Sequence, residues 1–186
     1  MLVLLDRDGV LNEEPGDWVK SPDELVMIEG AAEAVARLNA AGHCVVVITN
    51  QSVVGRGIID ETTLEAIHDR LRTHLAEASA HVDGIISCFD PPWAATPRRK
   101  PGPAMLCEAL ARRNALAEST LMIGDALTDL EAASAAGCQR ILVRTGKGGQ
   151  TESSGLPDHV LPVSVFDHLA AAIDSLLRHG HLRRGG

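Results

Sequence analysis

Two carboxylates, Asp6 and Asp8, follow directly on the apolar run of residues 2–5 near the start of the chain. A short run made only of Leu and Val is typical of a parallel strand that is covered on both faces. In an open α/β sheet, ligands bind beyond the carboxyl ends of such strands. We therefore expect Asp6 and Asp8 at the floor of a crevice, where a divalent cation would relieve their mutual repulsion. For this pair taken alone, an ordinary acidic turn that closes a strand is the alternative.

Polar side chains also follow three further apolar runs, at residues 45–48, 85–86 and 121–123. They are Thr49, Asn50, Gln51 and Ser52 after the first run, Arg99 and Lys100 at the end of the loop after the second, and Asp125 and Asp129 after the third. Because the carboxyl ends of parallel strands meet at one edge of a sheet, these groups are predicted to converge there. The recurrence favours a site over an isolated acidic turn.

Apolar runs alternate with amphipathic segments along the chain, which predicts an α/β fold with a three-layer, Rossmann-like, doubly wound parallel sheet. Strands are expected at residues 2–6, 45–48, 84–88, 121–123 and 140–143, and helices at 31–41, 60–80, 103–114, 129–136 and 165–177. A length of 186 residues suits one domain. We expect this domain to span residues 1–178, with residues 179–186 as a flexible basic tail.

Phosphoryl transfer requires the groups that are predicted to meet at this edge. One carboxylate attacks phosphorus and forms an acyl phosphate, and a second carboxylic acid protonates the departing alkoxide. Asp6 and Asp125 would supply carboxylates to Mg²⁺, which prefers oxygen ligands. Thr49 and Lys100 would hold the phosphate oxygens with hydroxyl and ammonium donors. Gly9 would let the backbone approach a phosphate closely.

Four short motifs, in this order along the chain, resemble those of the haloacid dehalogenase-like phosphohydrolases. They are Asp6-Arg7-Asp8-Gly9-Val10-Leu11-Asn12, Thr49-Asn50-Gln51-Ser52, Arg99-Lys100-Pro101, and Gly124-Asp125 with Asp129. Residues 46–52, 55–57 and 142–147 are also similar to one subfamily, the D-glycero-D-manno-heptose 1,7-bisphosphate 7-phosphatases and their histidinol-phosphatase relatives. The likeness covers roughly residues 1–175. The four motifs are specific together, whereas each alone is weak.

The resemblance implies a role for each matching position. Asp6 would be the nucleophile, Asp8 the general acid and base that also offers its backbone carbonyl to Mg²⁺, and Asp125 the remaining protein ligand. Phosphate or substrate would contact Thr49, Asn50, Gln51, Ser52, Arg99 and Lys100, and residues 14–17 would form an entrance loop against the sugar. Asp129 is expected to brace the site rather than to bind the metal. The short chain leaves no room for a large cap, so a capless haloacid dehalogenase fold is expected.

The chain departs from the subfamily in the loop before Lys100. Members often hold a structural zinc there with a Cys-x-His and a Cys-x-Cys, whereas residues 88–98 retain only Cys88 among those four ligands. Tetrahedral zinc needs four good ligands, so no zinc is predicted. Val53 and Ala126 also stand where a Gly and a Lys are common. These changes leave the exact substrate open.

Charge and composition disfavour several classes of partner. A formal net charge of -8 and an aromatic content of 2% give little attraction for nucleic acid or an anionic membrane. The cysteines are scattered without a Cys-x-x-Cys, so we expect free thiols in a reducing, cytoplasmic compartment. No leader is recognised and no apolar stretch approaches the roughly 20 residues that span a bilayer. A monomer is expected.

Two tryptophans, Trp18 and Trp93, fall in loops that are predicted to rim the site. Packing on the substrate and anchoring of the loop that carries each ring are both open readings. The glycine-rich stretch 146–149 lacks the residues that a P-loop requires. It is expected to be a mobile loop that touches substrate, and residues 150–155 are expected to be loop as well.

The sequence therefore predicts a Mg²⁺-dependent phosphomonoesterase that acts through an aspartyl phosphate on a small phosphorylated metabolite. The resemblance favours the 7-phosphate of D-glycero-D-manno-heptose 1,7-bisphosphate, on the way to the nucleotide-activated heptose of lipopolysaccharide. Histidinol phosphate and other small sugar phosphates are the alternatives within the class. A non-catalytic phosphometabolite-binding protein is the alternative of another class, and the intact set Asp6, Asp8, Thr49, Lys100 and Asp125 disfavours it.

Overall fold

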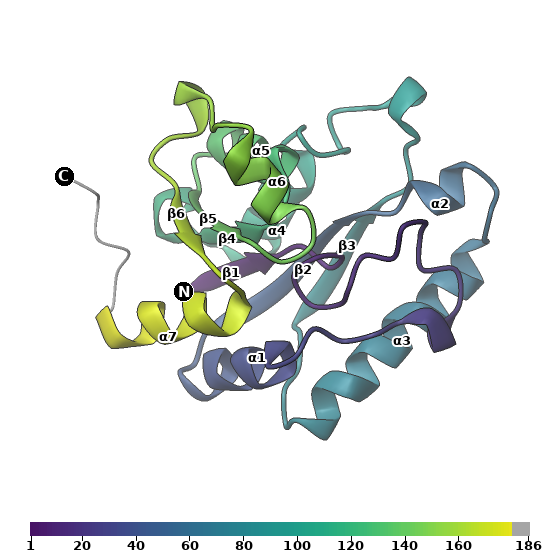
Figure 1. Ribbon diagram of the computed structural model, residues 1–186, viewed down its shortest axis with the longest axis horizontal. Helices are drawn as coiled ribbons and strands as arrows, with labels where there is room; N and C mark the ends of the chain where they lie inside the picture. The colour runs from purple at the N-terminus through teal and green to yellow at the C-terminus, as the bar shows by residue number, and fades with distance from the viewer. Residues whose placement is uncertain (180–186) are drawn as a thin grey trace.

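A six-stranded parallel sheet forms the centre of the computed structural model, which describes residues 1–179 (Figure 1). The strands lie in the order β3-β2-β1-β4-β5-β6. Their bounds are β1 Leu2–Leu5, β2 Cys44–Asn50, β3 Gly84–Cys88, β4 Leu121–Gly124, β5 Gln139–Val143 and β6 Ser164–Phe166. All five neighbouring pairs are parallel. The chain winds outwards in both directions from β1 and β4, so the topological switch point of this predicted doubly wound sheet lies between these two strands.

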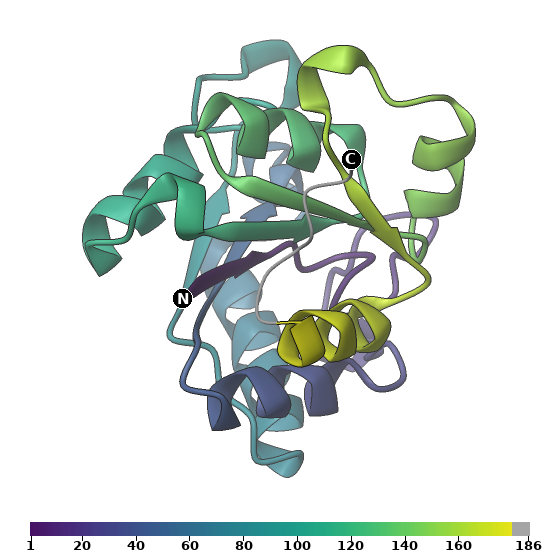
Figure 2. The ribbon, with the colours of Figure 1, turned by 90° about the vertical axis from the view of Figure 1, so that its left-hand side faces the viewer.

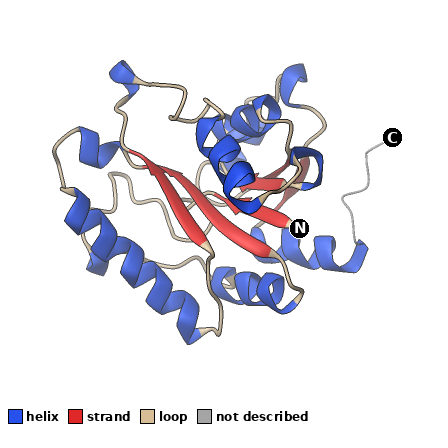
Figure 3. Ribbon diagram, turned by 180° about the vertical axis from the view of Figure 1, so that it is seen from behind, coloured by secondary structure: helices blue, strands red, loops and turns tan. Residues whose placement is uncertain are grey.

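Helices cover both faces of the sheet (Figures 2 and 3). One face packs against α1 (Ala31–Ala40), α3 (Glu61–Glu77) and α7 (Leu169–His179), and the other against α4 (Ala104–Arg113) and α5 (Leu127–Ala135). Alternate residues of β1 divide between the two cores: Val3 and Leu5 belong to the first, and Leu2 and Leu4 to the second. This period of two explains why β1 is apolar along its whole length.

Short helices lie in the connections. They are α2 Ser52–Gly55, α6 Gly148–Ser153 and the 3-10 turns Pro22–Glu24, Pro92–Ala94, Ala117–Ser119 and Asp158–Val160. Within residues 1–179 no separate cap domain is inserted between the elements of the sheet. Nor does any helix in this part of the chain have the length and apolarity to cross a membrane.

The predicted helix boundaries have local causes. The carboxylate of Asp60 accepts a hydrogen bond from the backbone N–H of Thr63 at 2.7 Å, which caps the start of α3. α1 ends just before Gly42, whose φ of 74° lies in the left-handed region that stops a helix. Four residues on one face of α3 are buried, as its sequence pattern predicts: Leu64, Ile67, Leu71 and Leu75.

Two predictions about the last third of the chain are wrong. The expected helix 165–177 is divided into β6 and α7, with a turn between Phe166 and Leu169. Residues 150–155 were expected as loop, but α6 extends from Gly148 to Ser153. Of the predicted tail, His179 is the last residue of α7, and residues 180–186 lie outside the described part of the chain.

Candidate active site

The carboxyl ends of β1 and β4 bring together three carboxylates that are far apart in the sequence. Asp6 follows β1, and its backbone N–H donates to the carbonyl of Ile123 in β4 at 3.0 Å. Asp125 follows β4, and Asp129 lies in the first turn of α5. One oxygen of each carboxylate lies within 4.8 Å of those of the other two. The predicted convergence at this edge of the sheet therefore exists.

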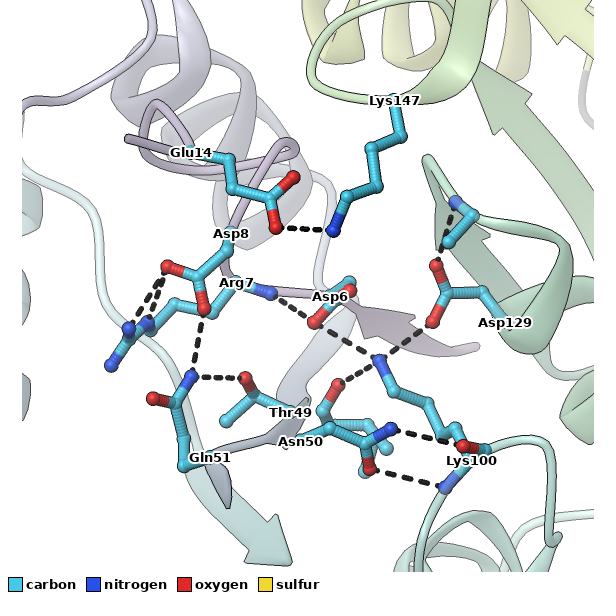
Figure 4. A network of polar contacts seen from close by, with 12 residues as sticks. Asp6, Arg7, Asp8, Glu14, Thr49, Asn50, Gln51, Lys100, Asp129 and Lys147 are labelled. Carbon is cyan, nitrogen blue, oxygen red and sulfur yellow. Dashed lines mark hydrogen bonds and ion pairs between the residues drawn. The ribbon is translucent and has the colours of Figure 1, made fainter. Parts of the chain in front are cut away.

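Lys100 reaches the same point from the loop after β3, and its side chain is only 2% exposed. Its ammonium donates to the carbonyl of Ile48 at 2.9 Å and forms ion pairs with Asp6 at 3.0 Å and with Asp129 at 2.6 Å (Figure 4). The amide of Asn50 fixes the backbone of Lys100 by accepting from its N–H at 3.1 Å and donating to its carbonyl at 3.0 Å. Asn50 is therefore occupied in positioning Lys100.

Burial and crowding of like charge dominate the electrostatics of the cluster. Burial raises the pKa of Asp6 well above its usual range; the Lys100 ammonium opposes this, and the neighbouring carboxylates add to it. Burial, and then the Asp129 carboxylate, raises the pKa of Asp125 to about 7. The pKa of Lys100 lies above its ordinary value because Asp129 and Asp6 outweigh the effect of its burial. A second source of positive charge would stabilise the ionised cluster.

The chemistry of the donor set fits a hard divalent cation. Mg²⁺ prefers carboxylate and carbonyl oxygens, and these are the groups gathered here. Both oxygens of Asp129 are already engaged: one accepts from the backbone N–H of Ala126 at 3.0 Å, and the other pairs with Lys100. Asp6 and Asp125 are therefore the better candidates for direct metal contact.

Asp8 lies beside this cluster with its carboxylate held by three side chains. Arg7 donates to one oxygen from Nη2 at 2.9 Å and Nε at 3.2 Å, and Asn12 donates to the same oxygen at 2.9 Å. Gln51 donates to the other oxygen at 2.7 Å and, from the same nitrogen, to Thr49 at 2.8 Å. Although burial alone would raise the pKa of Asp8, Arg7, Asn12 and Gln51 lower it below its ordinary value. Asp8 and Thr49 thus share one hydrogen-bonded network.

A pocket of about 720 Å³ opens above these groups. Loops from several elements line it, and the lining includes Asp6, Asp8, Glu14, Asp17, Trp18, Thr49, Asn50, Gln51, Ser52, Pro92, Ala95, Arg99, Lys100, Asp125 and Lys147. It therefore brings together every predicted catalytic, metal and phosphate position. Arg99 is oriented by donating to the carbonyl of Asp90 at 2.8 Å.

Gly9 lies behind Asp125 and turns the chain after β1 with a φ of 80°. A side chain at this position would overlap the Asp125 carboxylate and the backbone of Gly146. The hydroxyl of Thr145 donates to the carbonyl of Gly9 at 2.6 Å, which joins the two loops. The close approach at Gly9 is therefore to Asp125 and Gly146, and the expected approach to a phosphate stays a prediction.

The sequence pattern did not show how two charged residues of the site are placed. No role was predicted for Arg7, whose side chain is 1% exposed beneath Asp8. Lys147 pairs with Glu14 across the pocket (Figure 4). Its backbone N–H donates to Asp125 at 2.7 Å. The position of Arg7 between two aspartates is a usable signal, because an arginine there can satisfy a buried carboxylate. A backbone N–H donor leaves no such signal.

Cys88, the remaining cysteine of the rewritten loop, is buried at the end of β3. Within residues 1–179, the one group of three or more His, Cys, Asp or Glu side chains that could hold a metal ion is Asp6, Asp125 and Asp129. The absence of a structural zinc stays a prediction.

Comparison with known proteins gives consistent matches over this site and fold. The model of the HAD-hydrolase-like family matches residues 97–172. The D-glycero-beta-D-manno-heptose-1,7-bisphosphate 7-phosphatase of Pseudomonas aeruginosa is 42% identical over 95% of this chain and 98% of its own. The crystal structure of the D,D-heptose 1,7-bisphosphate phosphatase of Bordetella bronchiseptica with magnesium and phosphate is 41% identical, with a TM-score of 0.90 over 95% of this chain and 98% of that one. The crystal structure of the D,D-heptose 1,7-bisphosphate phosphatase of Burkholderia thailandensis is 36% identical, with a TM-score of 0.71 over 95% of this chain and 97% of that one.

Proposed function

This chain belongs to the D-glycero-beta-D-manno-heptose-1,7-bisphosphate 7-phosphatase family of haloacid dehalogenase-like hydrolases, and from this premise we propose that it removes the 7-phosphate of that sugar bisphosphate. The reaction is a Mg²⁺-dependent hydrolysis of a phosphomonoester. The observation that carries the proposal is the meeting of Asp6, Asp8, Asp125 and Lys100 in one pocket at the switch point of the sheet. A non-catalytic binding protein would not need a nucleophile and an acid side by side.

Asp6 is proposed as the nucleophile. Its carboxylate attacks phosphorus, the bond to the sugar oxygen breaks, and an acyl phosphate forms on Asp6. Lys100 contacts Asp6 at 3.0 Å and fixes the attacking group. Because its ammonium already has three acceptors, a phosphate oxygen would share or replace one of them. Water then attacks phosphorus, the bond from phosphorus to the Asp6 oxygen breaks, and inorganic phosphate leaves while the Asp6 carboxylate is regenerated.

Asp8 is proposed as the acid that protonates the departing sugar oxygen and then as the base that takes a proton from the attacking water. In the free protein, Arg7, Asn12 and Gln51 keep its pKa low. A bound phosphate places negative charge beside Asp8 and so favours its protonated form. Gln51 joins Asp8 to Thr49, a proposed phosphate ligand, so the acid and the phosphate contacts are positioned by the same side chain.

Mg²⁺ would be held by Asp6, Asp125 and the backbone carbonyl of Asp8, and it would offset the charge of a phosphate that meets carboxylates. Ser52 and Arg99 line the pocket and are proposed to contact the substrate, as are Glu14 and Asp17 of the entrance loop, which also line it. Asp129 is proposed to brace Lys100, to which it is ion-paired.

We also propose the compartment, the domain organisation and the oligomeric state in which the protein acts. We place it in the cytoplasm, since Cys44, Cys88, Cys107 and Cys138 are free thiols of the kind found in reducing compartments. Residues 1–178 are proposed as one phosphatase domain that acts as a monomer. Its partner is the phosphorylated sugar, and neither nucleic acid nor a membrane is required.

Phosphate release from a panel of phosphomonoesters, with and without Mg²⁺, tests the proposal. The panel contains D-glycero-D-manno-heptose 1,7-bisphosphate, histidinol phosphate and smaller sugar phosphates. We expect the heptose bisphosphate to be preferred by at least about tenfold in kcat/KM, which corresponds to about 1.4 kcal/mol. Asp6→Asn should abolish release, and it should retain the fold by circular dichroism. Mg²⁺-dependent release in which histidinol phosphate is preferred would keep the chemistry and replace the substrate, whereas no release from any compound would exclude the enzyme.

A further inference from the structure

The guanidinium of Arg56 lies between the rings of Trp18 and Trp93. Its central carbon is 4.9 Å from the ring centroid of Trp18 and 4.7 Å from that of Trp93. An arginine over the face of a tryptophan at this distance makes a cation–π contact, and Trp is the best aromatic partner for it. Here one cation makes the contact twice, so three side chains form a single stack.

The three side chains come from different segments around the pocket. Trp18 lies in the entrance segment between β1 and α1, and Arg56 directly follows α2. Trp93 lies in the 3-10 turn Pro92–Ala94, which forms the tip of the loop between β3 and α4 and stands at the upper right of Figure 1. Trp18 lines the pocket, as do Pro92 and Ala95 close to Trp93. The stack therefore joins two walls of the pocket through the residue that follows α2.

Few other contacts hold the tip of this loop in place. Trp93 is 71% exposed, so burial of its ring does not fix it. The Asp90 carboxylate accepts hydrogen bonds from the backbone N–H of Thr96 at 2.9 Å and from its hydroxyl at 2.6 Å, which shapes the loop internally without attaching its tip elsewhere. Residues 89–100 contain neither Cys nor His, so they cannot supply the nitrogen or sulfur ligands of a zinc site.

The base of the loop is already fixed against the same helix. The backbone N–H of Gln51 donates to the carbonyl of Cys88 at 2.7 Å. A side chain at Gly55 would overlap the carbonyl of Phe89, so this glycine permits the close approach of α2. Arg56 follows Gly55 directly and reaches further out along the same loop. The contact at the base thus places Arg56 where it can hold the tip.

We propose that Trp18, Arg56 and Trp93 form a clasp that holds the two loops beside the pocket together and thereby determines which phosphorylated metabolites fit. The clasp residues are positioning and specificity-determining residues rather than catalytic ones. They act on the part of the substrate beyond the transferred phosphate, because the walls that they join lie above the Asp6 and Lys100 cluster. The inference rests on the proposed phosphatase function and concerns its selectivity.

Arg56→Met and Trp93→Ala test the clasp, with Arg112→Met and Leu116→Ala as controls. Arg112 is an exposed arginine of α4, and Leu116 is an exposed apolar residue away from the pocket, so the controls match the loss of a surface cation and of a surface apolar side chain. The measured quantity is kcat/KM for the heptose bisphosphate divided by kcat/KM for p-nitrophenyl phosphate. Both clasp variants should lower this ratio by about tenfold, mainly through KM, and the controls should leave it unchanged. Trp93→Phe, which keeps an aromatic face, should retain most of the ratio.

Tryptophan fluorescence and hydrogen exchange test the clasp without reference to catalysis. The chain has two Trp and no Tyr, and both Trp belong to the clasp, so the emission reports on it alone. Arg56→Met should shift the emission, and in both clasp variants the backbone amides of residue 90 and residues 93–96 should exchange faster. These two readouts remain valid even if the protein proves to be no phosphatase.

Two results would overturn the inference. One is an unchanged selectivity ratio in variants whose fluorescence and exchange show an opened clasp. The other is a loss of activity in Arg56→Met that neither Trp93→Ala nor Trp18→Ala reproduces, because Arg56 would then bind the substrate directly instead of joining the loops.

Discussion

Lys100 is a single buried cation that two carboxylates share, so its removal has separable effects on stability and on activity. In Lys100→Met, Asp6 and Asp129 would remain together without the ammonium that they share, and breaking a buried ion pair from one side costs about 3–5 kcal/mol. We expect a lower free energy of unfolding in urea and no phosphate release. The double variant Lys100→Met with Asp129→Asn removes one of the stranded charges, so it should regain part of the stability but none of the activity. Equal stability of the single and double variants would contradict this account.

The buried ring of His68 leads us to expect that the free energy of unfolding decreases at acidic pH. Burial, together with the charge of Arg7, lowers its pKa to about 4, and Glu65 and Arg72 also face the ring. The unfolded chain binds a proton at His68 near pH 6.5, whereas the folded chain does not. The stability of the fold with a neutral His68 is therefore fully present above pH 6.5 and is lost as the pH falls towards 4. The loss from this group is about 3 kcal/mol at most.

The measurement is the free energy of unfolding of the wild type and His68→Gln between pH 7.5 and 4.5. Since glutamine does not titrate, the difference between the two proteins should change in favour of the variant as the pH falls, while the contributions of other acidic groups cancel. His74→Gln on the same helix reports the effect of removing a more exposed histidine. A difference that does not vary with pH would show that His68 is protonated equally in both states.

Single residues differ in how far their places can be predicted from the sequence. The meeting of Asp6, Asp125 and Lys100 could be predicted because each follows a strand, and parallel strands end at one edge. The burial of Arg7 has only one local signal, its position between two aspartates, because the sequence does not show that His68, about sixty positions away, comes close to it. Roles that depend on backbone donors, such as the N–H of Lys147, leave no trace in side-chain chemistry.

Gly124 shows how one element constrains another. It is the last residue of β4, and a side chain here would overlap the Asp129 carboxylate in α5. Gly124→Ala should therefore displace Asp129 and with it Lys100, costing about 1–3 kcal/mol of stability and much of the kcat. Gly84→Ala, at the start of β3, is the matched control, because its new carbon would meet no atom closer than 3.6 Å. Comparable losses in both variants would mean that strand propensity, not the contact with Asp129, is responsible.

The wrongly predicted helix 165–177 covers a segment in which a strand and a helix follow each other while the spacing of apolar residues fits a helix throughout. Val165 and Leu169 are four positions apart, and Ile173 follows at the same interval, so residues 165–177 read as one helix. In the structure Val165 belongs instead to a three-residue strand that pairs with Leu142. Tertiary pairing decides the outcome, because a strand this short carries too few residues to establish a period of two.

The position of the pocket at the edge of the sheet explains why the surrounding loops matter so much for selectivity. The sheet supplies a fixed edge at which carboxylates and a lysine meet, and this edge determines the chemistry. Within residues 1–179 no cap domain covers that edge, so the pocket walls come from the entrance segment, α2 and the loop after β3. The reaction could therefore be predicted from strand ends, whereas the substrate depends on loop contacts such as the stack on Arg56, which no local pattern encodes.

Metal binding at the switch point should stabilise the protein against unfolding, because the site is complete only when both halves of the sheet are in place. A ligand at one hundred times its Kd adds about 2.7 kcal/mol to the free energy of unfolding. For a domain of this size, that raises Tm by about 5–10 °C. We expect such a shift with Mg²⁺ in differential scanning calorimetry, with a further rise when inorganic phosphate is added.

Asp125→Asn separates metal binding from general stabilisation. Without Mg²⁺ the variant should unfold at or above the Tm of the wild type, because it lacks one of three crowded carboxylates and its amide oxygen can still accept from Lys147. With Mg²⁺ its Tm should rise far less, since a proposed metal ligand has lost its charge. An equal Mg²⁺-induced shift in the variant and the wild type would place the metal elsewhere, and the proposed assignment of Asp6 and Asp125 as the carboxylates that hold it would then be wrong.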